Sequence, residues 1–277
     1  MSRDFVAVGD VMLDGSLPEA VPGRRVHGRI DLRAGGSAAN AALAAARSGA
    51  RSAVVGRVGA DPAGRLVGDA LAESGVEALL ARDPDVPTGC VIVVGTAIVA
   101  DRGASVRLAV EDLPPTIEAG AVLVSGYSLL QEPAEIAARA ALARARTEWL
   151  AVDAASARLV EAFGIERFFA ATAAVDVLLA NAEEARALTG LDGEEAALEL
   201  ARRYRVACVK LGPDGAVAAR GGEVARAAAP PLESVDTLGA GDAFAAGFLR
   251  ALDAGAELER AVAAGCEAAR RQLVTIR

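Results

Sequence analysis

Short apolar segments alternate with longer amphipathic segments along most of the 277-residue chain. Residues 5 to 13, FVAVGDVML, are apolar and β-branched and predict a buried strand. Residues 35 to 49, GGSAANAALAAARSG, begin with glycines and predict a helix that ends at Gly49. The alternation continues through 51–59 (strand), 62–75 (helix), 121–127 (strand), 133–146 (helix), 148–154 (strand), 175–190 (strand into helix), 195–205 (helix), 206–219 (strand and turn), 243–255 and 258–272 (helices). This order predicts a mostly parallel sheet covered by helices on both faces.

Two segments break the alternation. Residues 15 to 34 are rich in proline, glycine and arginine, and residues 88 to 110 are strand-like with no helix between them. Both predict a few antiparallel strands added at the edge of the α/β body, where a small sheet could form a lid or a dimer contact. The chain has no internal repeat and no low-complexity linker, and its length suits a single domain over residues 1–277.

Composition narrows the class of protein. A hydrophobic content of 53% supplies a sizeable core, and an aromatic content of 3% means that alanine, valine and leucine build it. The net charge of -8 with no basic stripe argues against nucleic acid as a partner. No apolar run approaches the ~18 residues of a membrane span, and the N-terminus lacks the layout of a signal peptide. We therefore expect a cytoplasmic protein with no membrane partner, in which Cys90, Cys208 and Cys266 are neither disulfide-bonded nor zinc ligands.

Several catalytic chemistries are disfavoured. His27 is the only histidine and has no obvious partner, so a Ser-His-Asp, Cys-His or histidine-metal site is not expected. The chain contains no P-loop motif, and GAGDAF lacks the third glycine of the dinucleotide-binding fingerprint. Conversely, Lys210 is the only lysine, and Asn40 and Asn181 are the only asparagines. The abundance of alanine, glycine, arginine and valine suggests a GC-rich genome, in which such rare residues are candidates for functional roles.

The stretch DTLGAGDAF at 236 to 244 predicts an anion site. Gly239, Ala240 and Gly241 can bring successive backbone N–H groups into one concavity at the start of a helix. Asp242 has two interpretations: it caps the helix, or it accepts the proton of a hydroxyl group that attacks the bound anion.

Other polar residues lie at predicted strand ends and helix starts. Asn181 and Glu184, three residues apart, either form a capping box or hold water around Mg²⁺ or phosphate oxygens. Lys210 ends a strand next to a glycine-rich turn, where it either meets a phosphate or is an ordinary strand-end lysine. Near the N-terminus, small or polar groups suit turns or the hydroxyl groups of a sugar: Asp10, Asp14, Gly35, Gly36 and Asn40. Ligands of open α/β sheets bind at the carboxyl ends of the strands.

These blocks resemble a known family. DTLGAGDAFAAGF resembles the C-terminal signature of the ribokinase-like (PfkB) carbohydrate kinases, and AGGSAANAALAAARSGA resembles their N-terminal signature. The segments at 9–14, 55–64, 125–127, 181–190 and 209–216 follow the order of that family, so the resemblance covers essentially the whole chain. It implies a three-layer α/β sandwich with a central, mostly parallel sheet and a small β-lid within 15–34 and 88–110, which often mediates dimers.

The resemblance also implies a role for each candidate residue. Asp242 would be the base, and Gly239, Ala240 and Gly241 would complete the anion hole for the γ-phosphate of ATP. Asp14, Gly35, Gly36 and Asn40 would bind sugar hydroxyls, with Asp10 nearby. Asn181 and Glu184 would organise Mg²⁺ and phosphates through water. The nucleotide would be lined by Lys210, Gly212 and Gly215. Asp236 matches a position that contributes to a monovalent-cation site in several relatives, but this match leaves open whether a cation binds here.

We therefore expect an ATP- and Mg²⁺-dependent kinase that phosphorylates a hydroxyl group of a small sugar. Ribokinase itself has lysine and asparagine at the positions of Ser37 and Met12, which makes ribose a less favoured acceptor. A nucleoside kinase of the same fold, and a sugar or nucleotide sensor without turnover, are the alternatives. The strand-like segment at 88 to 110 predicts a homodimer through the lid.

Overall fold

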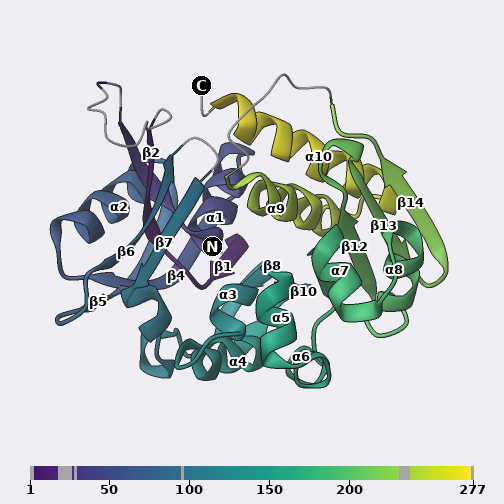
Figure 1. Cartoon of the computed structure of the whole chain (residues 1–277), viewed down its shortest axis with the longest axis horizontal. Helices are drawn as coiled ribbons and strands as arrows, with labels where there is room; N and C mark the ends of the chain where they lie inside the picture. Colours follow the sequence, from purple (N-terminus) through teal and green to yellow (C-terminus); the bar gives the residue numbers. More distant parts are fainter. Residues whose placement is uncertain (1–2, 18–26, 28–29, 95–96, 231–237, 276–277) are drawn as a thin grey trace.

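The central feature of the computed structural model is a large sheet between two layers of helices (Figure 1). The structure describes residues 3–17, 27, 30–94, 97–230 and 238–275. Ten strands form the large sheet in this part of the chain, with β9 (Ala145–Arg146) paired to β8 beside the main path. Along that path the order is β14 (Glu223–Ala227), β13 (Ala216–Arg220), β12 (Val206–Lys210), β11 (Val177–Asn181), β10 (Trp149–Asp153), β8 (Ile117–Ser125), β1 (Arg3–Val8), β4 (Ser52–Gly59) and β5 (Val76–Asp83). Only the pairs β12–β13 and β13–β14 are antiparallel among these, which confirms the mostly parallel sheet.

Helices bury both faces of this sheet. Along β1, Phe5 and Ala7 pack into one apolar cluster while Val6 and Val8 pack into another, as expected for a strand covered on both faces. The first cluster includes α1 (Ser37–Arg47), α2 (Pro62–Glu73), α9 (Ala240–Asp253) and α10 (Leu258–Thr275). The second includes α3 (Gly126–Leu129), α4 (Ala134–Arg144), α5 (Ala157–Phe163), α6 (Ile165–Ala171), α7 (Ala182–Thr189) and α8 (Gly193–Leu200). The three-layer architecture predicted from the sequence is therefore confirmed.

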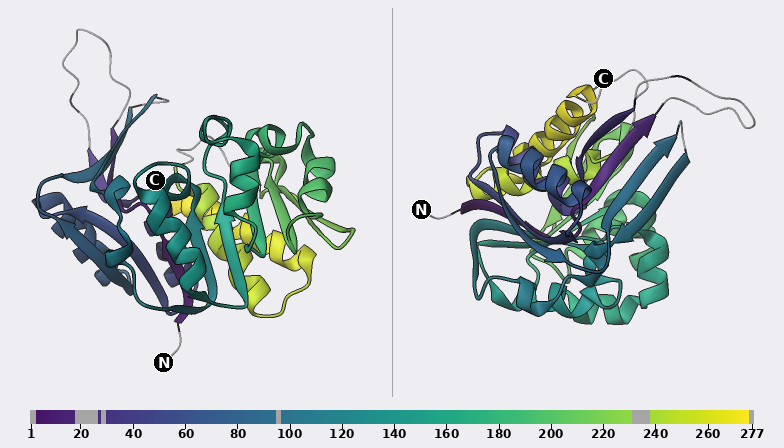
Figure 2. Two further views of the ribbon diagram at one scale, coloured as in Figure 1. Left: turned by 90° about the horizontal axis from the view of Figure 1, so that it is seen from below. Right: turned by 90° about the vertical axis from the view of Figure 1, so that its left-hand side faces the viewer.

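A separate four-stranded sheet projects from one end of the molecule (Figure 2). Its order is β3 (Asp31–Gly35), β2 (Met12–Leu17), β6 (Thr88–Val94) and β7 (Ala97–Gly103). The predicted small lid sheet is thus present, but β2 starts before residue 15, and the β2–β6 pair is parallel where antiparallel strands were expected. Beyond β7, the chain forms short 3₁₀ turns at Ala104–Arg107 and Val110–Asp112 instead of continuing as a strand.

The prediction of one strand over residues 5 to 13 is wrong. The chain leaves the large sheet after Val8 and enters the lid sheet at Met12. Between them, Gly9 has a φ of 145°, and a β-carbon there would lie 2.6 Å from the β-carbon of Ser125. A residue with a side chain cannot take this path, so glycine permits the turn that places Asp10 between the two sheets.

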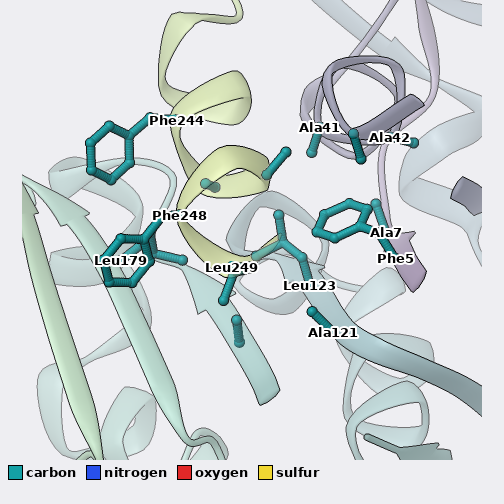
Figure 3. Packing of buried hydrophobic residues seen from close by; sticks show 14 of the residues in the cluster. Phe5, Ala7, Ala41, Ala42, Ala121, Leu123, Leu179, Phe244, Phe248 and Leu249 are labelled. Carbon is teal, nitrogen blue, oxygen red and sulfur yellow. The ribbon is translucent and has the colours of Figure 1, made fainter. Parts of the chain in front are cut away.

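The core fixes the position of α9. Figure 3 shows Phe248 and Leu249 of this helix pointing toward Leu179 and Leu123 of the sheet, with α1 alongside. Phe248 and Leu249 are fully buried, and each contributes roughly 1.5–3 kcal/mol to stability. Packing along α9 therefore fixes the position of the start of this helix.

None of the helices in the described part of the chain is long and apolar enough to cross a membrane. The single-domain assignment stays a prediction.

Candidate active site

The start of α9 forms an open cluster of backbone N–H groups. Gly239 is the N-cap residue, with a left-handed φ of 78°, and it makes no side-chain capping hydrogen bond. The first N–H groups of a helix have no partner within the helix, and they attract negative charge. The sequence pattern predicted a helix over 243–255 with Asp242 as its possible cap, but the helix begins at Ala240, so Asp242 is the third helical residue and does not cap the helix.

The Asp242 carboxylate sits in a polar cluster beside these N–H groups. Asn40, buried in α1, donates a hydrogen bond from Nδ2 to Oδ2 of Asp242 at 3.2 Å. Burial raises the pKa of Asp242 to about 7, and the carboxylates of Asp153 and Asp10 add to the rise. Lys210 and the Asn40 hydrogen bond lower the pKa but do not outweigh burial. Asp242 is therefore a carboxylate that can exchange a proton near neutral pH.

Lys210 lies between carboxylates and the start of α9. Its Nζ pairs with Oδ2 of Asp153 at 2.5 Å, and it lies 3.4 Å from the position that a β-carbon on Gly241 would occupy. Burial lowers the pKa of Lys210, but the charges of Asp153 and Glu184 outweigh this and raise it, so the ammonium group stays charged. Asp153 was not among the residues predicted from the sequence, although an acidic residue that ends the buried strand β10 was a usable signal.

Asn181 and Glu184 form the capping box of α7. The backbone N–H and Nδ2 of Asn181 donate to Oε2 and Oε1 of Glu184 at 2.8 and 2.7 Å, and the N–H of Glu184 donates to Oδ1 of Asn181 at 2.9 Å. Burial, with the charge of Asp153, raises the pKa of Glu184 to about 7. Each carboxylate oxygen still has a lone pair left to accept a hydrogen bond from water. Capping therefore does not use all the acceptor capacity of Glu184, which is compatible with the predicted role near Mg²⁺.

The part of the chain that the structure describes holds no cluster of three or more metal-ligating His, Cys, Asp or Glu side chains. Mg²⁺ keeps several waters and binds through one or two carboxylates together with phosphate oxygens. The buried carboxylate of Glu184, near Asp153 and Lys210, fits such a water-mediated site.

Asp10 lies at the junction of the two sheets. Its Oδ2 accepts from the backbone N–H of Ser37 at 2.9 Å, and its Oδ1 accepts from the hydroxyl of Ser125 at 2.7 Å. At Gly36, with a φ of 86°, a β-carbon would lie 2.5 Å from the carbonyl oxygen of Asp10. Glycine at position 36 therefore lets the start of α1 approach this carboxylate closely.

Asp14 lies on β2 against Gly35 of the neighbouring strand. A β-carbon on Gly35 would lie 1.9 Å from Cγ of Asp14, so the carboxylate occupies the space that a side chain at position 35 would need. The structure thus brings Asp10, Asp14 and Asn40 to the same end of the molecule as Asp242, although these residues are distant in the sequence.

Arg102 reaches this region from the lid, and sequence analysis did not identify it. Its guanidinium group stacks over the ring of Tyr127 at 3.7 Å, and Nη1 contacts Oδ2 of Asp10 at 3.3 Å. The side chain is 22% exposed. Because arginine is frequent in this chain, composition gave no signal for it.

The remaining candidates lie around or beyond this cluster. Gly212 is exposed in the turn after β12, and Gly215 packs against β14, where a β-carbon would lie 2.0 Å from the carbonyl oxygen of Ala227. The predicted cation residue Asp236 lies outside the described residues. His27 is exposed.

Comparisons with known proteins identify the family and the fold of the chain. The family model described as pfkB family carbohydrate kinase matches residues 2–273. A 2-dehydro-3-deoxygalactonokinase from Haloferax volcanii is 30% identical, with 97% of this chain and 90% of the relative covered. An adenosine kinase from Sinorhizobium meliloti superposes with a TM-score of 0.85 at 27% identity, covering 99% and 94% of the two chains. A fructokinase double mutant from Vibrio cholerae O395, bound to fructose, ADP and a potassium ion, superposes with a TM-score of 0.80 at 25% identity, covering 97% and 90%.

These likenesses define the fold as ribokinase-like and the class as a phosphotransferase with a hydroxyl acceptor. The chain belongs to the PfkB family of carbohydrate kinases. The resemblance inferred from the sequence is confirmed.

Proposed function

We propose that this protein transfers the γ-phosphate of ATP, with Mg²⁺, to a hydroxyl group of a small sugar. The observation that carries the proposal is the Asp242 carboxylate, whose pKa is raised to about 7, beside the uncapped N–H groups of α9. The open helix start and Lys210 offer positive charge to phosphate, while Asn40 holds the carboxylate on the side of the acceptor residues.

Each group then has one chemical task. Asp242 accepts the proton of the acceptor hydroxyl as its oxygen bonds to the γ-phosphorus, and the bond from that phosphorus to the bridging oxygen of ADP breaks. The N–H groups of Gly239 to Asp242 stabilise the charge on the transferring group. Glu184 and Asn181 would hold water around Mg²⁺, which neutralises phosphate charge when bound. Asp10, Asp14, Gly35, Gly36 and Asn40 would position the sugar, and Lys210, Gly212 and Gly215 would line the nucleotide.

For the acceptor, we propose a sugar acid whose carboxylate binds Arg102. Asp10 already accepts two hydrogen bonds at 2.7 and 2.9 Å, and its contact with Arg102 is longer, at 3.3 Å. A guanidinium group has five N–H donors in a fork that matches a carboxylate, and stacking on Tyr127 fixes its plane. The similarity to a 2-dehydro-3-deoxygalactonokinase supports this acceptor class. The similarity to an adenosine kinase makes a nucleoside the second candidate.

The acceptor class is tested by coupled ADP detection with 2-dehydro-3-deoxygalactonate, fructose and adenosine. We expect the highest kcat/KM for the acid. Arg102→Gln should lower it by about 10- to 100-fold, the range for losing a hydrogen bond to a charged group, while changing the value for fructose less. Arg107→Gln, an exposed arginine of the neighbouring 3₁₀ turn that pairs with Asp83, is the matched control. Equal effects of Arg102→Gln on acid and neutral acceptors would reject the sugar acid, and a preference for adenosine would favour the nucleoside kinase.

We further propose that two copies associate through the lid. Leu32, Gly15, Ile92 and Val99 are paired in register across β3, β2, β6 and β7, so they form one apolar row on a single face of the lid sheet. Leu32 is 52% exposed and Val99 is 66% exposed. Asp14, next to Gly15 on β2, points to the opposite face, so the row lies away from the acceptor residues.

We also propose a cytoplasmic location, which fits the use of ATP and the three free cysteines.

A further inference from the structure

A buried amide joins the last helix to the start of α9. Gln272 of α10 is only 6% exposed. Its Oε1 accepts a hydrogen bond from Nη1 of Arg47, the last residue of α1. Its Nε2 lies 3.1 Å from the position that a β-carbon on Gly239 would occupy. Gln272 therefore links two helices to the N-cap residue of a third.

Two amide side chains converge on Gly239, in the space that a β-carbon there would occupy. Beside Gln272 lies Asn40, whose Cγ and Nδ2 are both 3.2 Å from the same β-carbon position. The left-handed φ of 78° at Gly239 sets the direction in which the chain enters α9. The backbone N–H groups that follow Gly239 are the proposed hydrogen-bond donors to phosphate. The two amides therefore control the direction in which these N–H groups point.

The orientation of the Gln272 amide is defined by its partner. A guanidinium group can only donate hydrogen bonds, so the amide oxygen must face Arg47 and the amide nitrogen must face Gly239. Asn40, the second amide, also donates to Asp242 at 3.2 Å. The contacts thus run from Arg47 through Gln272 and Gly239 to Asn40 and the proposed base.

We propose that Gln272 is a positioning residue, which packs with Asn40 over Gly239 and so sets both the phosphate-binding N–H groups and the Asn40–Asp242 hydrogen bond. This inference rests on the proposed kinase function. None of the roles that the sequence predicted includes α10, and Gln272 acts through Gly239 and Asn40 and not by touching the reacting groups.

The decisive variant is Gln272→Met, which keeps the length and apolar volume of the side chain but removes the amide. We expect the KM for ATP to rise about 5-fold, the equivalent of one hydrogen bond of about 1 kcal/mol, with little change in the KM of the acceptor. The acid limb of the kcat profile should move to higher pH, because the Asn40 hydrogen bond lowers the pKa of Asp242 and would weaken. The substitution removes no charge, and the charged groups near Asp242 and around Gln272 stay in place: Asp10, Asp153, Lys210, Arg102, Arg33 and Arg47.

Two further variants separate positioning from simple loss of packing. Arg47→Met removes the partner of the amide oxygen and should reproduce the KM and pH effects, and the double variant should add little to either single variant. Arg271→Ala, which changes the exposed neighbour of Gln272 that pairs with Glu267, should leave the KM for ATP and the acid limb unchanged. Thermal unfolding of each variant checks that the fold is retained.

Equilibrium binding of Mg·ATP by calorimetry completes the test without requiring turnover. Gln272→Met should raise the Kd by the same factor as the KM. Wild-type Kd, KM and acid limb in Gln272→Met would overturn the positioning role while leaving the kinase function intact. Absence of ADP release by the wild-type protein with every acceptor would instead reject the proposed function, and the binding measurement would still decide whether Gln272 sets the phosphate site.

Discussion

At the scale of single residues, the site is organised by a surplus of buried carboxylates. Asp10, Asp153 and Glu184 lie close enough to influence Asp242 or Lys210, and the charge of Lys210 offsets them only in part. Removing a carboxylate from water disfavours its charged form, and like charges increase the effect. The pKa values of Asp242 and Glu184 are each raised to about 7 as a result. A base with a pKa near the working pH combines a deprotonated ground state with useful proton affinity.

This arrangement predicts a pH-dependent stability. Below an unfolded-state pKa of 3.8 the protonated Asp242 carboxyl contributes fully to stability, and this contribution is lost as the pH rises through about 7. The free energy of unfolding should therefore fall between about pH 4 and 7. Asp242→Asn should remove part of that fall and stabilise the protein at pH 8 by about 1–3 kcal/mol, which denaturant unfolding at several pH values would measure. Asp69→Asn, an exposed aspartate on α2, is the control. A pH profile of stability identical in wild type and Asp242→Asn would contradict the account.

At the scale of secondary-structure elements, the site consists of strand ends and helix starts. The sequence predicted the candidates that belong to such junctions, because glycine, asparagine and aspartate there stand out from the apolar periodicity. Asp153 was missed because its strand carries no glycine-rich block after it. Arg102 and Gln272 were missed because they reach the cluster from a lid strand and from the last helix, and periodicity does not reveal which distant side chains meet. The start of α9 was misplaced by three residues because Gly239, and not the Asp242 side chain, occupies the N-cap position.

The contact between β2 and β3 predicts an acceptor-specific defect. Gly35→Ala would place a β-carbon 1.9 Å from Cγ of Asp14, so the carboxylate must move. We expect the KM of the acceptor to rise at least ~10-fold, because a displaced Asp14 carboxylate loses most of its charged hydrogen bond to the acceptor. The KM for ATP should change little. Gly68→Ala on α2, where the nearest atom is the end of the Arg82 side chain at 3.3 Å, is the control. An unchanged acceptor KM in Gly35→Ala, measured by coupled ADP detection, would remove Asp14 from the acceptor site.

At the scale of the whole molecule, the large sheet and the lid sheet lie side by side (Figure 1), and Asp10 lies on the chain between them, after β1 and before β2. The alternating pattern was sufficient to predict the large sheet and its helix layers. It could not predict the break after Val8, because Val11 and Met12 continue the apolar run of β1 into a different sheet. The apolar row on the outer face of the lid has no covering element among the described residues of this chain, which is why we assign it to a second copy.

The proposed dimer is tested by light scattering at micromolar concentration. The wild-type protein should have about twice the mass of the 27.9 kDa chain. Val99→Glu should give a monomer, because a buried unpaired charge is costly at an interface. Ile98→Glu, on the neighbouring residue of the same strand and 62% exposed, points to the opposite face and should remain dimeric. A monomeric wild-type protein would refute dimerisation.

The central claim is that Asp242 is the base of a phosphotransferase, and one measurement tests it most directly. Asp242→Asn replaces the carboxylate with an amide of the same shape, which cannot accept the acceptor proton in the same way. With saturating Mg·ATP and an acceptor that the wild-type protein phosphorylates, the rate of ADP release should fall by ~10²–10⁴, while Mg·ATP binding and the fold are retained. A kcat within a few-fold of wild type would contradict the claim.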